Sequence, residues 1–477
     1  MKKVSRRDFL RWSAVGGTGL VVSACAPQIV ERTVEVTKEV EVEVPVEITV
    51  EGETVVVTAT PEPVSLYIWS YWTPPRDEAL QASLDAFMDL HPEITAIHEL
   101  LPSSGASEKV LTAIAGGEPP DILMLHSTNI PAYADQGSLM RLDKHMDRDG
   151  ISSDAWFPAD VGPCSYQNLL WGLPAVGAGT RPIFYNKGHL EEVGIDPTVW
   201  PPATSWEDLE ELAGKLNVFE GGEMERMGFY PICRGGYYPR ETDFDWFMVF
   251  NGGRRVSADF KSAAFDAPYR EAMQWLVDLT DEYCGGFETA QAFMEYARSG
   301  VEDYNAPFYA GKLSMGISGP WEFTMVPDLA PDIEFDVFQV PYGPSYTEDF
   351  VTEEGYLWTW VIPNGAEYPD AAWKLLRWLT YDEGCGIFTR AMLRPPALIS
   401  EAQTSFWEEN IPQFPHYVEA MSVMPKADPM PAFPGFNDVS DQAMEEALRH
   451  NMTVDEACDW AAEESQKIID EYWAKQA

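Results

Sequence analysis

The stretch Val64-Ser-Leu-Tyr-Ile-Trp69 opens a long region in which strand-like and helix-like patterns alternate. This short apolar run is typical of a buried strand, and the spacing of Leu80, Leu84, Phe87 and Leu90 gives the next segment one apolar helical face. Alternation of this kind over the whole length favours an α/β architecture with largely parallel sheets. In such sheets, ligands bind at the carboxyl ends of the strands.

The same two patterns recur further along the chain. Asp121-Ile-Leu-Met-Leu125 is predicted to be a strand. Thr204-Ser-Trp-Glu207 has the spacing of a capping box, so we expect a helix to begin there, and a further helix to begin at Pro369-Asp370. The residues expected on the apolar faces of these two helices are Leu209, Leu212, Leu216, Trp373, Leu376 and Leu379.

Residues 1–24 have the features of an export signal. Arg6 and Arg7 fit the twin-arginine motif, and the short apolar run after them ends at Val22-Ser23-Ala24-Cys25, which fits the box for cysteine lipidation and cleavage. The run is shorter than the about 20 residues that span a bilayer. We expect a twin-arginine lipoprotein signal peptide and a mature protein that a lipid on Cys25 anchors outside the cytoplasm, at the cell surface or in the periplasm. A buried N-terminal helix is the alternative.

Residues 25–63 are mostly valine, threonine and glutamate in alternation and end in a Pro-containing stretch. We expect the lipidated cysteine to be followed by an extended, solvated linker, because no Asn-Gly or Asp-Gly turn is present and glutamates on one face would repel each other. The period of two is also typical of a half-buried strand, which is the alternative.

Composition limits the remaining part of the chain. Roughly 400 residues follow Pro63, and 45% of the whole sequence is apolar, which suffices for two cores. The formal net charge of −45 argues against nucleic acid as a partner, because phosphate binding needs a basic face. Five widely spaced cysteines permit at most two disulfides and leave one thiol free, and the sequence does not give their pairing: Cys164, Cys233, Cys284, Cys385 and Cys458.

Signals for catalysis are few. The seven histidines form no HExxH pair, and the sequence has no GxSxG elbow, Walker loop or GxGxxG, so we expect neither a metal nor a cofactor. The 77 acidic residues make chance pairs of carboxylates unavoidable, and a glycoside hydrolase needs only two. A lipid-anchored extracellular glycoside hydrolase is therefore the enzyme alternative.

Aromatic residues lie where several predicted strands end. The sequence has 17 Trp, 20 Tyr and 23 Phe, and flat aromatic rings match the apolar faces of sugar rings. Most large aromatics pack in cores, but Trp321 directly follows Gly319-Pro320, a turn that ends a strand and presents the next side chain at its mouth.

Residues 64–477 resemble the family 1 extracellular solute-binding proteins, which are sugar-binding lipoproteins of ABC importers. The resemblance rests on a set of motifs that occur in family order behind a lipoprotein signal. These are Leu111-Thr-Ala-Ile-Ala-Gly-Gly-Glu-Pro-Pro-Asp-Ile122, Gly137-Ser-Leu-Met-Arg-Leu-Asp143, Trp171-Gly-Leu-Pro174, Phe184-Tyr-Asn-Lys187, Pro202-Ala-Thr-Ser-Trp-Glu207, Phe308-Tyr-Ala-Gly-Lys-Leu-Ser-Met-Gly-Ile-Ser-Gly-Pro-Trp321, the helix from Pro369 to Leu379, Leu393-Arg-Pro-Pro396 and Thr453-Val-Asp-Glu-Ala457.

The resemblance implies a two-lobe, periplasmic-binding-protein-like α/β fold of type II, with a ligand cleft between lobes joined by crossover strands. The N-terminal lobe would comprise residues 64–176 and 355–395, and the C-terminal lobe residues 177–354 and 396–477. Such a protein captures a carbohydrate, from a mono- to an oligosaccharide, and delivers it unchanged to the membrane subunits of an ABC permease. It is not an enzyme, and ligand shifts its lobes toward a closed state.

By the same resemblance, ten residues are candidates for ligand binding: Trp69, Tyr71, Asp121, His126, Ser127, Trp321, Glu322, Trp358, Arg394 and Phe436. Alternatives stay open for several of them. Asp121 is as often structural, Glu322 could cap a helix, and Arg394 could form a salt bridge between the lobes. Tyr185 is expected to pack, whereas His126 and Thr180-Arg181 depart from the family pattern.

The net charge also bears on the ligand. It makes a multiply anionic ligand less expected, unless arginines such as Arg181, Arg240 and Arg394 gather in the cleft.

Overall fold

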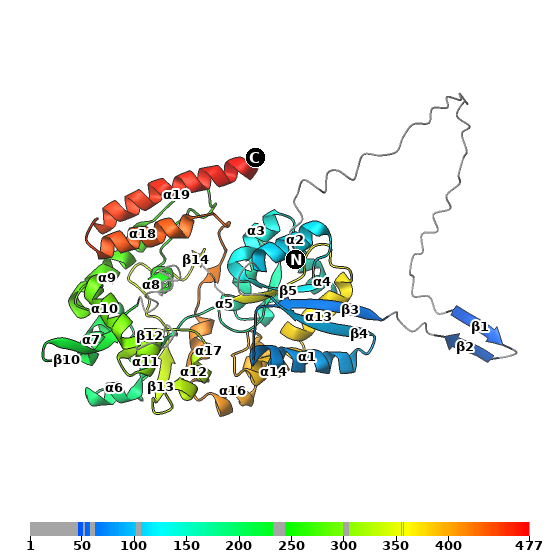
Figure 1. Cartoon of the computed structure of the whole chain (residues 1–477), viewed down its shortest axis with the longest axis horizontal. Coiled ribbons are helices and arrows are strands. Elements are labelled where there is room, and N and C mark those ends of the chain that lie inside the picture. Colours follow the sequence, from blue (N-terminus) through cyan, green and yellow to red (C-terminus); the bar gives the residue numbers. More distant parts are fainter. Residues whose placement is uncertain are drawn as a thin grey trace, which may run out of the picture. The chain divides into compact units, whose positions relative to one another are not determined.

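The computed structural model describes residues 46–50, 53–57, 63–101, 106–231, 244–298, 305–353, 355 and 357–476 (Figure 1). The predicted signal peptide, Cys25, Cys233 and Arg240 lie outside the described residues. The chain divides into two compact units, Met1–Pro61 and Glu62–Ala477. Each unit is described by itself.

In the first unit, β1 (Val46–Val50) and β2 (Glu53–Val57) pair as antiparallel strands. The register runs from Val46 opposite Val57 to Val50 opposite Glu53. Each glutamate therefore stands opposite a valine and not opposite another glutamate. Residues 46–50 and 53–57 therefore form paired strands, and the extended linker over residues 25–63 stays a prediction.

The second unit contains two five-stranded sheets. The first has the order β4-β3-β5-β15-β8, formed by Ile94–Leu100, Val64–Ser70, Ile122–His126, Trp358–Val361 and Gly172–Pro174. The second has the order β10-β11-β12-β9-β13, formed by Val218–Glu220, Glu223–Phe229, Leu313–Ile317, Ile183–Asn186 and Phe335–Phe338.

Both sheets are mixed, so the prediction of largely parallel sheets is wrong. In the first sheet, β3 pairs in parallel with β4 and β5, whereas β15 is antiparallel to β5 and β8. In the second sheet, β11 and β12 are parallel, and β9 is antiparallel to β12 and β13. Strands β9 and β15 each follow a segment of chain that comes from the other sheet. Each of them runs antiparallel to both of its neighbours.

Helices surround each sheet in Figure 1. With the first sheet are α1 (Arg76–Leu90), α2 (Ala106–Gly116), α3 (Ile130–Asp135), α4 (Asp143–Asp149), α5 (Pro158–Val161), α13 (Pro369–Thr380), α14 (Glu383–Ala391) and the short pair β6 (Ser165–Tyr166) and β7 (Leu169–Leu170). With the second are α6 (Lys187–Glu192), α7 (Trp206–Leu216), α8 (Phe244–Phe250), α9 (Ala267–Tyr283), α10 (Phe287–Arg298), α11 (Ala306–Tyr309), α12 (Glu322–Leu329), α15 (Ile399–Ala402), α16 (Ser405–Asn410), α17 (Phe414–Ser422), α18 (Phe436–Leu448) and α19 (Val454–Gln476). A further parallel pair joins β14 (Val351–Thr352) to β16 (Lys426–Ala427).

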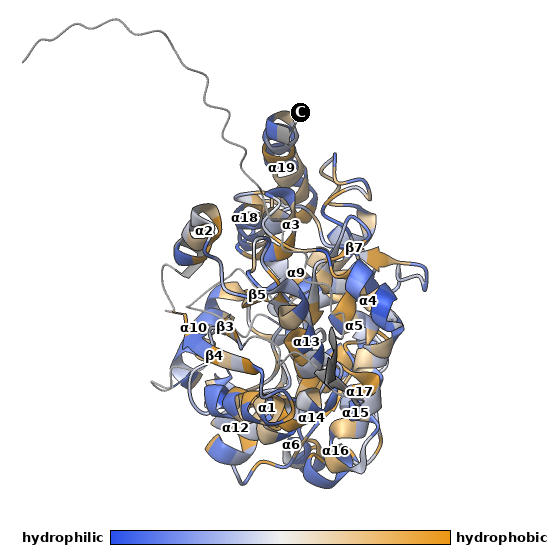
Figure 2. Cartoon of the chain, turned by 90° about the vertical axis from the view of Figure 1, so that its right-hand side faces the viewer, coloured by the Kyte–Doolittle hydropathy of each residue, from blue (hydrophilic) through white to orange (hydrophobic). Residues whose placement is uncertain are grey.

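The periodic patterns of the sequence are recovered with small shifts. Helix α1 buries Leu80, Leu84 and Phe87 and shows both hydrophilic and hydrophobic residues, whereas the short α4 is largely hydrophilic (Figure 2). Leu90, predicted on the same apolar face, is 58% exposed because it ends the helix.

The predicted apolar faces of α7 and α13 are confirmed, since all six leucine and tryptophan side chains predicted there are buried. The cap of α7 differs from the predicted one. Ser205 is the N-cap residue, and its hydroxyl accepts from the backbone N–H of Asp208, so the box lies one residue later than Thr204 and Glu207.

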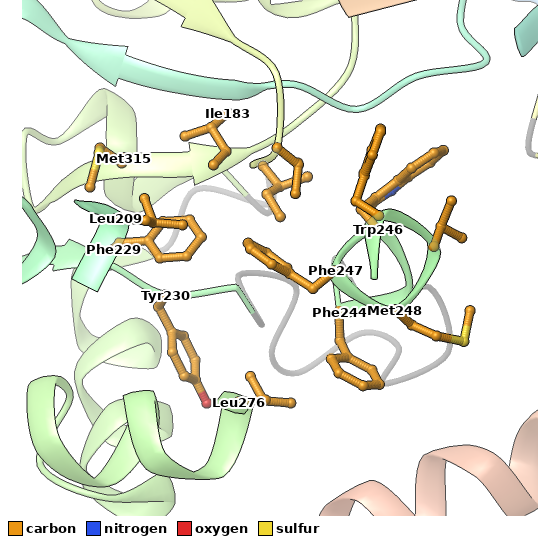
Figure 3. Close-up of a cluster of buried hydrophobic side chains, with 14 of the residues drawn as sticks. Ile183, Leu209, Phe229, Tyr230, Phe244, Trp246, Phe247, Met248, Leu276 and Met315 are labelled. Atoms are coloured by element: carbon orange, nitrogen blue, oxygen red, sulfur yellow. The ribbon is translucent and has the colours of Figure 1, made fainter. Parts of the chain in front are cut away.

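Two hydrophobic cores underlie the two sheets. One core is built from residues between Leu66 and Ala178 together with Leu357 to Leu398, and the other from residues between Ile183 and Val340 together with Ala402 to Ile469. Figure 3 shows part of the second core, where Phe229 from β11, Phe247 from α8 and Leu276 from α9 lie near one another. The predicted lobe limits, 176/177 and 395/396, lie near these changes of core and stay a prediction. Below, the first sheet with its core is called the first lobe, and the second sheet with its core is called the second lobe.

Helix α5 connects the two lobes. Phe157 and Ala159 belong to the core of the second lobe although their neighbours in sequence belong to the first. The buried carboxylate of Asp160 accepts the backbone N–H groups of Ala178 at 2.9 Å and Gly179 at 2.7 Å through the same oxygen, Oδ1. A Cβ at Gly179 would lie 2.0 Å from the carbonyl oxygen of Ala159, so only glycine allows this approach.

The four cysteines among the described residues, Cys164, Cys284, Cys385 and Cys458, are buried free thiols. Burial raises the pKa of Cys284 and of Cys385 to about 12, which keeps these thiols protonated. None of the helices in the described part combines the length and the apolar character that crossing a membrane requires.

Candidate ligand-binding site

Three strands of the first sheet bring aromatic residues to one edge. The parallel strands β3 and β5 end at Ser70 and His126, and the antiparallel strand β15 begins at Trp358, which is directly opposite His126. Trp69 and Tyr71 flank the end of β3. These four aromatic side chains therefore lie where the sequence predicts a ligand, at the carboxyl ends of parallel strands.

The rings at this edge contact one another. Tyr71 and Trp358 have ring centroids 5.2 Å apart, and His126 meets Trp358 edge-on at 5.3 Å. The Nδ1 atom of His126 lies 2.8 Å from the hydroxyl of Thr128. All three rings are half-buried, and burial raises the pKa of the Tyr71 hydroxyl. They form an aromatic surface that is partly open to solvent.

Trp69 stands beside this surface with a cation on its face. The ammonium group of Lys109, an exposed residue of α2, lies 4.1 Å from the centre of its ring. The local sequence gave no sign of this contact, because β4 separates α2 from β3 along the chain.

The second sheet presents Trp321 at its own edge. Strand β12 ends at Ile317, which pairs with Ile183 at the start of β9, and Trp321 follows as the residue before α12. Its ring is half-buried, and the guanidinium of Arg181 lies 4.5 Å from the ring centre. A Cβ at Gly319 would lie 2.2 Å from the ring, so glycine is required for the ring to fold against this turn.

Residues 175–182 connect the two edges. This segment leaves the first sheet where Ala175 donates to the carbonyl of Trp358 and enters the second at Ile183. Eight residues span about 30 Å at most. This short segment therefore joins the strand end beside the aromatic surface to Ile183, which pairs with the end of β12 before Trp321.

A pocket of about 530 Å³ lies at the same edge of the first sheet and is shared by both lobes. Gly355, which lines this pocket, accepts a hydrogen bond from the hydroxyl of Ser127 at 2.9 Å. The residues that line it are Thr128, Ala132, Asp135, Gln136, Glu353, Gly355, Pro429, Met430, Pro431, Ala432, Phe433, Pro434, Asn437 and Tyr472. A pocket of this volume is typical of small-molecule sites.

Both carboxylates of the pocket are held by groups of the protein. Asp135 accepts from the hydroxyls of Tyr166, at 3.1 Å, and Tyr472. Glu353 accepts the backbone N–H of Arg255 at 2.7 Å and pairs with the guanidinium of Arg254 at 3.4 Å. Burial raises the pKa of Glu353, and the two arginines act against this shift. The rest of the lining includes three prolines, Met430 and Phe433.

Two of the predicted ligand-binding residues, Asp121 and Ser127, have hydrogen-bond partners within their own lobe. Asp121 accepts the backbone N–H of Tyr67 at 2.9 Å, and burial raises its pKa. Ser127 is buried and also accepts the backbone N–H of Leu357 at 3.1 Å. In this structure both side chains fasten strand ends of the first lobe.

Glu322 is buried at the start of α12. Its carboxylate accepts from the hydroxyl of Ser318 at 2.7 Å, from the hydroxyl of Tyr309 at 2.8 Å and from the amide of Asn305. These three donors fix the turn that carries Trp321.

Arg394 lies at the crossover between the lobes and is 9% exposed. Burial raises the pKa of Tyr417, and the charges of Asp160, Arg181 and Arg394 also act on it. Two arginines and one carboxylate therefore lie close enough to this hydroxyl for their charges to act on it. Tyr185, expected to pack, is fully buried.

Phe436 does not face the pocket. It is 1% exposed and stacks on Phe265, with ring centroids 6.1 Å apart, inside the core of the second lobe. The next residue, Asn437, lines the pocket in its place. Sequence reasoning also missed the segment Pro429-Met-Pro-Ala-Phe-Pro434, whose density of proline is a signal for a rigid loop.

The described residues contain no group of three or more His, Cys, Asp or Glu that could hold a metal ion. The arrangement provides partly open aromatic rings at two sheet edges and a pocket between the lobes.

Comparison with known proteins agrees with this architecture. The family model of the bacterial extracellular solute-binding proteins matches residues 72–384. The chain belongs to this family. The resemblance noted in the sequence is thus confirmed.

As an extracellular solute-binding protein, the chain has relatives and structural neighbours of low sequence identity. A Brucella abortus protein described as a binding protein is 23% identical over 360 residues, which are 75% of this chain and 80% of the relative. The sugar-binding protein MalE of Xanthomonas citri is similar in structure, with a TM-score of 0.70 at 17% identity, over 86% of this chain and 99% of that one. The cyclic α-maltosyl-1,6-maltose-binding protein of Arthrobacter globiformis has a TM-score of 0.69 at 22% identity, over 86% of this chain and 100% of that one.

These similarities establish the two-lobe α/β fold that the resemblance implies. They also place this solute-binding protein among binding proteins and not among enzymes. The glycoside hydrolase alternative is therefore set aside.

Proposed function

We propose that this solute-binding protein captures a carbohydrate, from a mono- to an oligosaccharide, between its lobes and delivers it to the membrane subunits of an ABC permease. In this proposal it works outside the cytoplasm, exported through the twin-arginine signal of residues 1–24 and anchored by a lipid on Cys25. The lobes would comprise residues 64–176 with 355–395 and residues 177–354 with 396–477.

The observation that carries the proposal is the partly open aromatic surface of Tyr71, His126 and Trp358 beside a pocket of about 530 Å³. Sugar rings have apolar faces that stack on aromatic rings and hydroxyl edges that need hydrogen-bond partners. Trp69 and Trp321 supply further rings, one on each lobe. Two structural neighbours are a sugar-binding protein and a cyclic α-maltosyl-1,6-maltose-binding protein, which supports the same ligand class.

In the proposed site, Trp69, Tyr71, Trp358 and Trp321 stack on the sugar, and His126 contributes a polar contact. Asp121, Ser127 and Glu322 act by fixing strand ends and turns. Arg394 stays a candidate ligand donor at the crossover.

A thermal-shift and calorimetric screen against sugars, polyols and peptides tests this function. A ligand at 100 times its Kd raises the unfolding free energy by about 2.7 kcal/mol, which is readily detected. We expect one or a few carbohydrates to bind and to be recovered unchanged. Failure of every carbohydrate, with binding of peptides instead, would refute the ligand class, and recovery of a cleaved sugar would refute a pure binding role.

The anchor requires a separate test. Cys25→Ser should release the protein from the membrane fraction without changing sugar binding, because the cysteine is the proposed site of the lipid. Arg6→Lys combined with Arg7→Lys should retain the protein in the cytoplasm. Unchanged membrane association of Cys25→Ser would contradict lipidation.

A further inference from the structure

The C-terminal helix contacts the first lobe through one tyrosine. Helix α19 contributes Ala457, Cys458, Ala461 and Ile469 to the core of the second lobe. Near its end, the hydroxyl of Tyr472 donates to Oδ2 of Asp135, the last residue of α3 in the first lobe. This hydrogen bond joins residues that are 337 positions apart in the chain.

The Tyr472 side chain is held in place on the side of the second lobe. Its ring meets Phe433 edge-on with centroids 5.0 Å apart and Trp473 edge-on at 5.3 Å. The indole N–H of Trp473 donates to the carbonyl of Phe260 at 2.8 Å, which fixes the end of α19 to its own lobe. The tyrosine is therefore a rigid extension of the second lobe.

The acceptor is fixed in the same way on the side of the first lobe. Tyr166, at the end of β6, donates to the same carboxylate oxygen of Asp135 at 3.1 Å. Burial, followed by the hydrogen bond to Asp135, raises the pKa of Tyr472 well above its usual range, so its hydroxyl stays a donor. A hydroxyl that donates to an ionised carboxylate forms a stronger bond than one between neutral groups.

The bond also lies on the wall of the pocket. Asp135 and Tyr472 both line it, as does Phe433, against which the tyrosine packs. Moving the lobes apart at this point must break the bond.

We propose that Tyr472 and Asp135 form a clasp between the lobes that holds the pocket closed on one side and thereby favours the ligand-binding arrangement. The inference rests on the proposed function for the identity of the ligand, but the clasp itself acts on the empty protein. By favouring the arrangement in which the pocket is formed, it raises the fraction of molecules ready to bind and slows release of the ligand. Tyr472 is thus a positioning residue.

The test compares three variants of the full chain. Two of them remove one partner of the clasp, and the third is a control. Tyr472→Phe removes the interlobe donor but keeps the ring, and Asp135→Ala removes the acceptor. Tyr342→Phe is the matched control, because its hydroxyl donates to the carbonyl of Val423 at 3.1 Å within the second lobe. Each variant is first shown to melt cooperatively.

Small-angle X-ray scattering without ligand is the deciding measurement. Tyr472→Phe and Asp135→Ala should both increase the radius of gyration, whereas Tyr342→Phe should match the wild type. Equal radii for the wild type and both clasp variants would overturn the proposal, whatever the protein binds.

With maltotriose as the first probe, dissociation from Tyr472→Phe should be faster by about fivefold, the effect of one net hydrogen bond. If the wild type binds no carbohydrate, the proposed function fails, and the scattering result still decides whether the clasp exists. An unchanged dissociation rate with a clearly bound sugar would also count against the clasp.

Discussion

Asp160→Asn should stabilise the protein above neutral pH and flatten the dependence of its stability on pH. The carboxylate is buried, and both of its backbone donors, Ala178 and Gly179, bond to Oδ1. Among the described residues, Oδ2 has no hydrogen-bond partner. Asparagine keeps a side-chain oxygen that can accept from Ala178 and Gly179, and it carries no charge. It therefore retains both hydrogen bonds and removes the free-energy cost of burying an anion.

The magnitude follows from the pKa. Burial raises the pKa of Asp160 from 3.8 to about 7, and the two backbone N–H donors act against this shift. Because the folded pKa lies above the unfolded one, the native state holds a proton that the unfolded state loses between about pH 4 and pH 7. The free energy of unfolding therefore falls as the pH rises through this window, by up to about 4 kcal/mol. Asp160→Asn lacks this loss.

Urea unfolding of the wild type and of Asp160→Asn from pH 4 to pH 8 measures the effect. The difference in unfolding free energy should be near zero at pH 4 and should grow toward about 4 kcal/mol in favour of the variant at pH 8. Other carboxylates are common to both proteins and cancel in the difference. Asp154→Asn, at an exposed position, should run parallel to the wild type. Parallel curves for Asp160→Asn as well would refute the reasoning.

Three further changes test the site. Trp358→Ala should weaken sugar binding at least tenfold in calorimetry while the protein still melts cooperatively, because a stacking surface is lost. Gly319→Ala should displace the Trp321 ring, since the added methyl would lie 2.2 Å from it, and should lower affinity, whereas Gly116→Ala, with nothing within 4 Å, should bind as the wild type does. Glu322→Ala should lower the free energy of unfolding by about 1–3 kcal/mol, because the hydroxyls of Ser318 and Tyr309 and the amide of Asn305 would lose their shared acceptor; unchanged stability would show that these bonds are replaceable.

Local patterns in the sequence predicted individual elements well. The period of apolar residues placed α1 and α13, and the short apolar runs placed β3 and β5, because burial of one face controls both. Whether a strand pairs in parallel or antiparallel was harder to predict from the sequence. Whether β15 lies parallel or antiparallel to β5 depends on how the chain re-enters the sheet, and no residue of β15 encodes that.

The candidate site divides along the same line. Trp69, Trp358 and Trp321 follow or begin strands, so a local turn signal was sufficient to place them at sheet edges. Phe436 shows that an error of one residue on a helix changes which side chain faces a site. Neighbouring residues on a helix point about 100° apart, so Phe436 is buried in the core and Asn437 lines the pocket. Asp135 and Tyr472 are 337 positions apart in the chain, so the sequence around either residue does not indicate their contact.

The path of α5 limits how this protein can be divided into parts. Phe157 and Ala159 fill the core of the second lobe, yet the chain on both sides of them belongs to the first. A fragment of the second lobe alone would carry a cavity where these side chains belong, and a fragment of the first would expose them to water. Expression of the isolated lobes should therefore yield insoluble chains, and protease cuts at the crossovers should leave the pieces associated. The two lobes are therefore expected to fold as one unit.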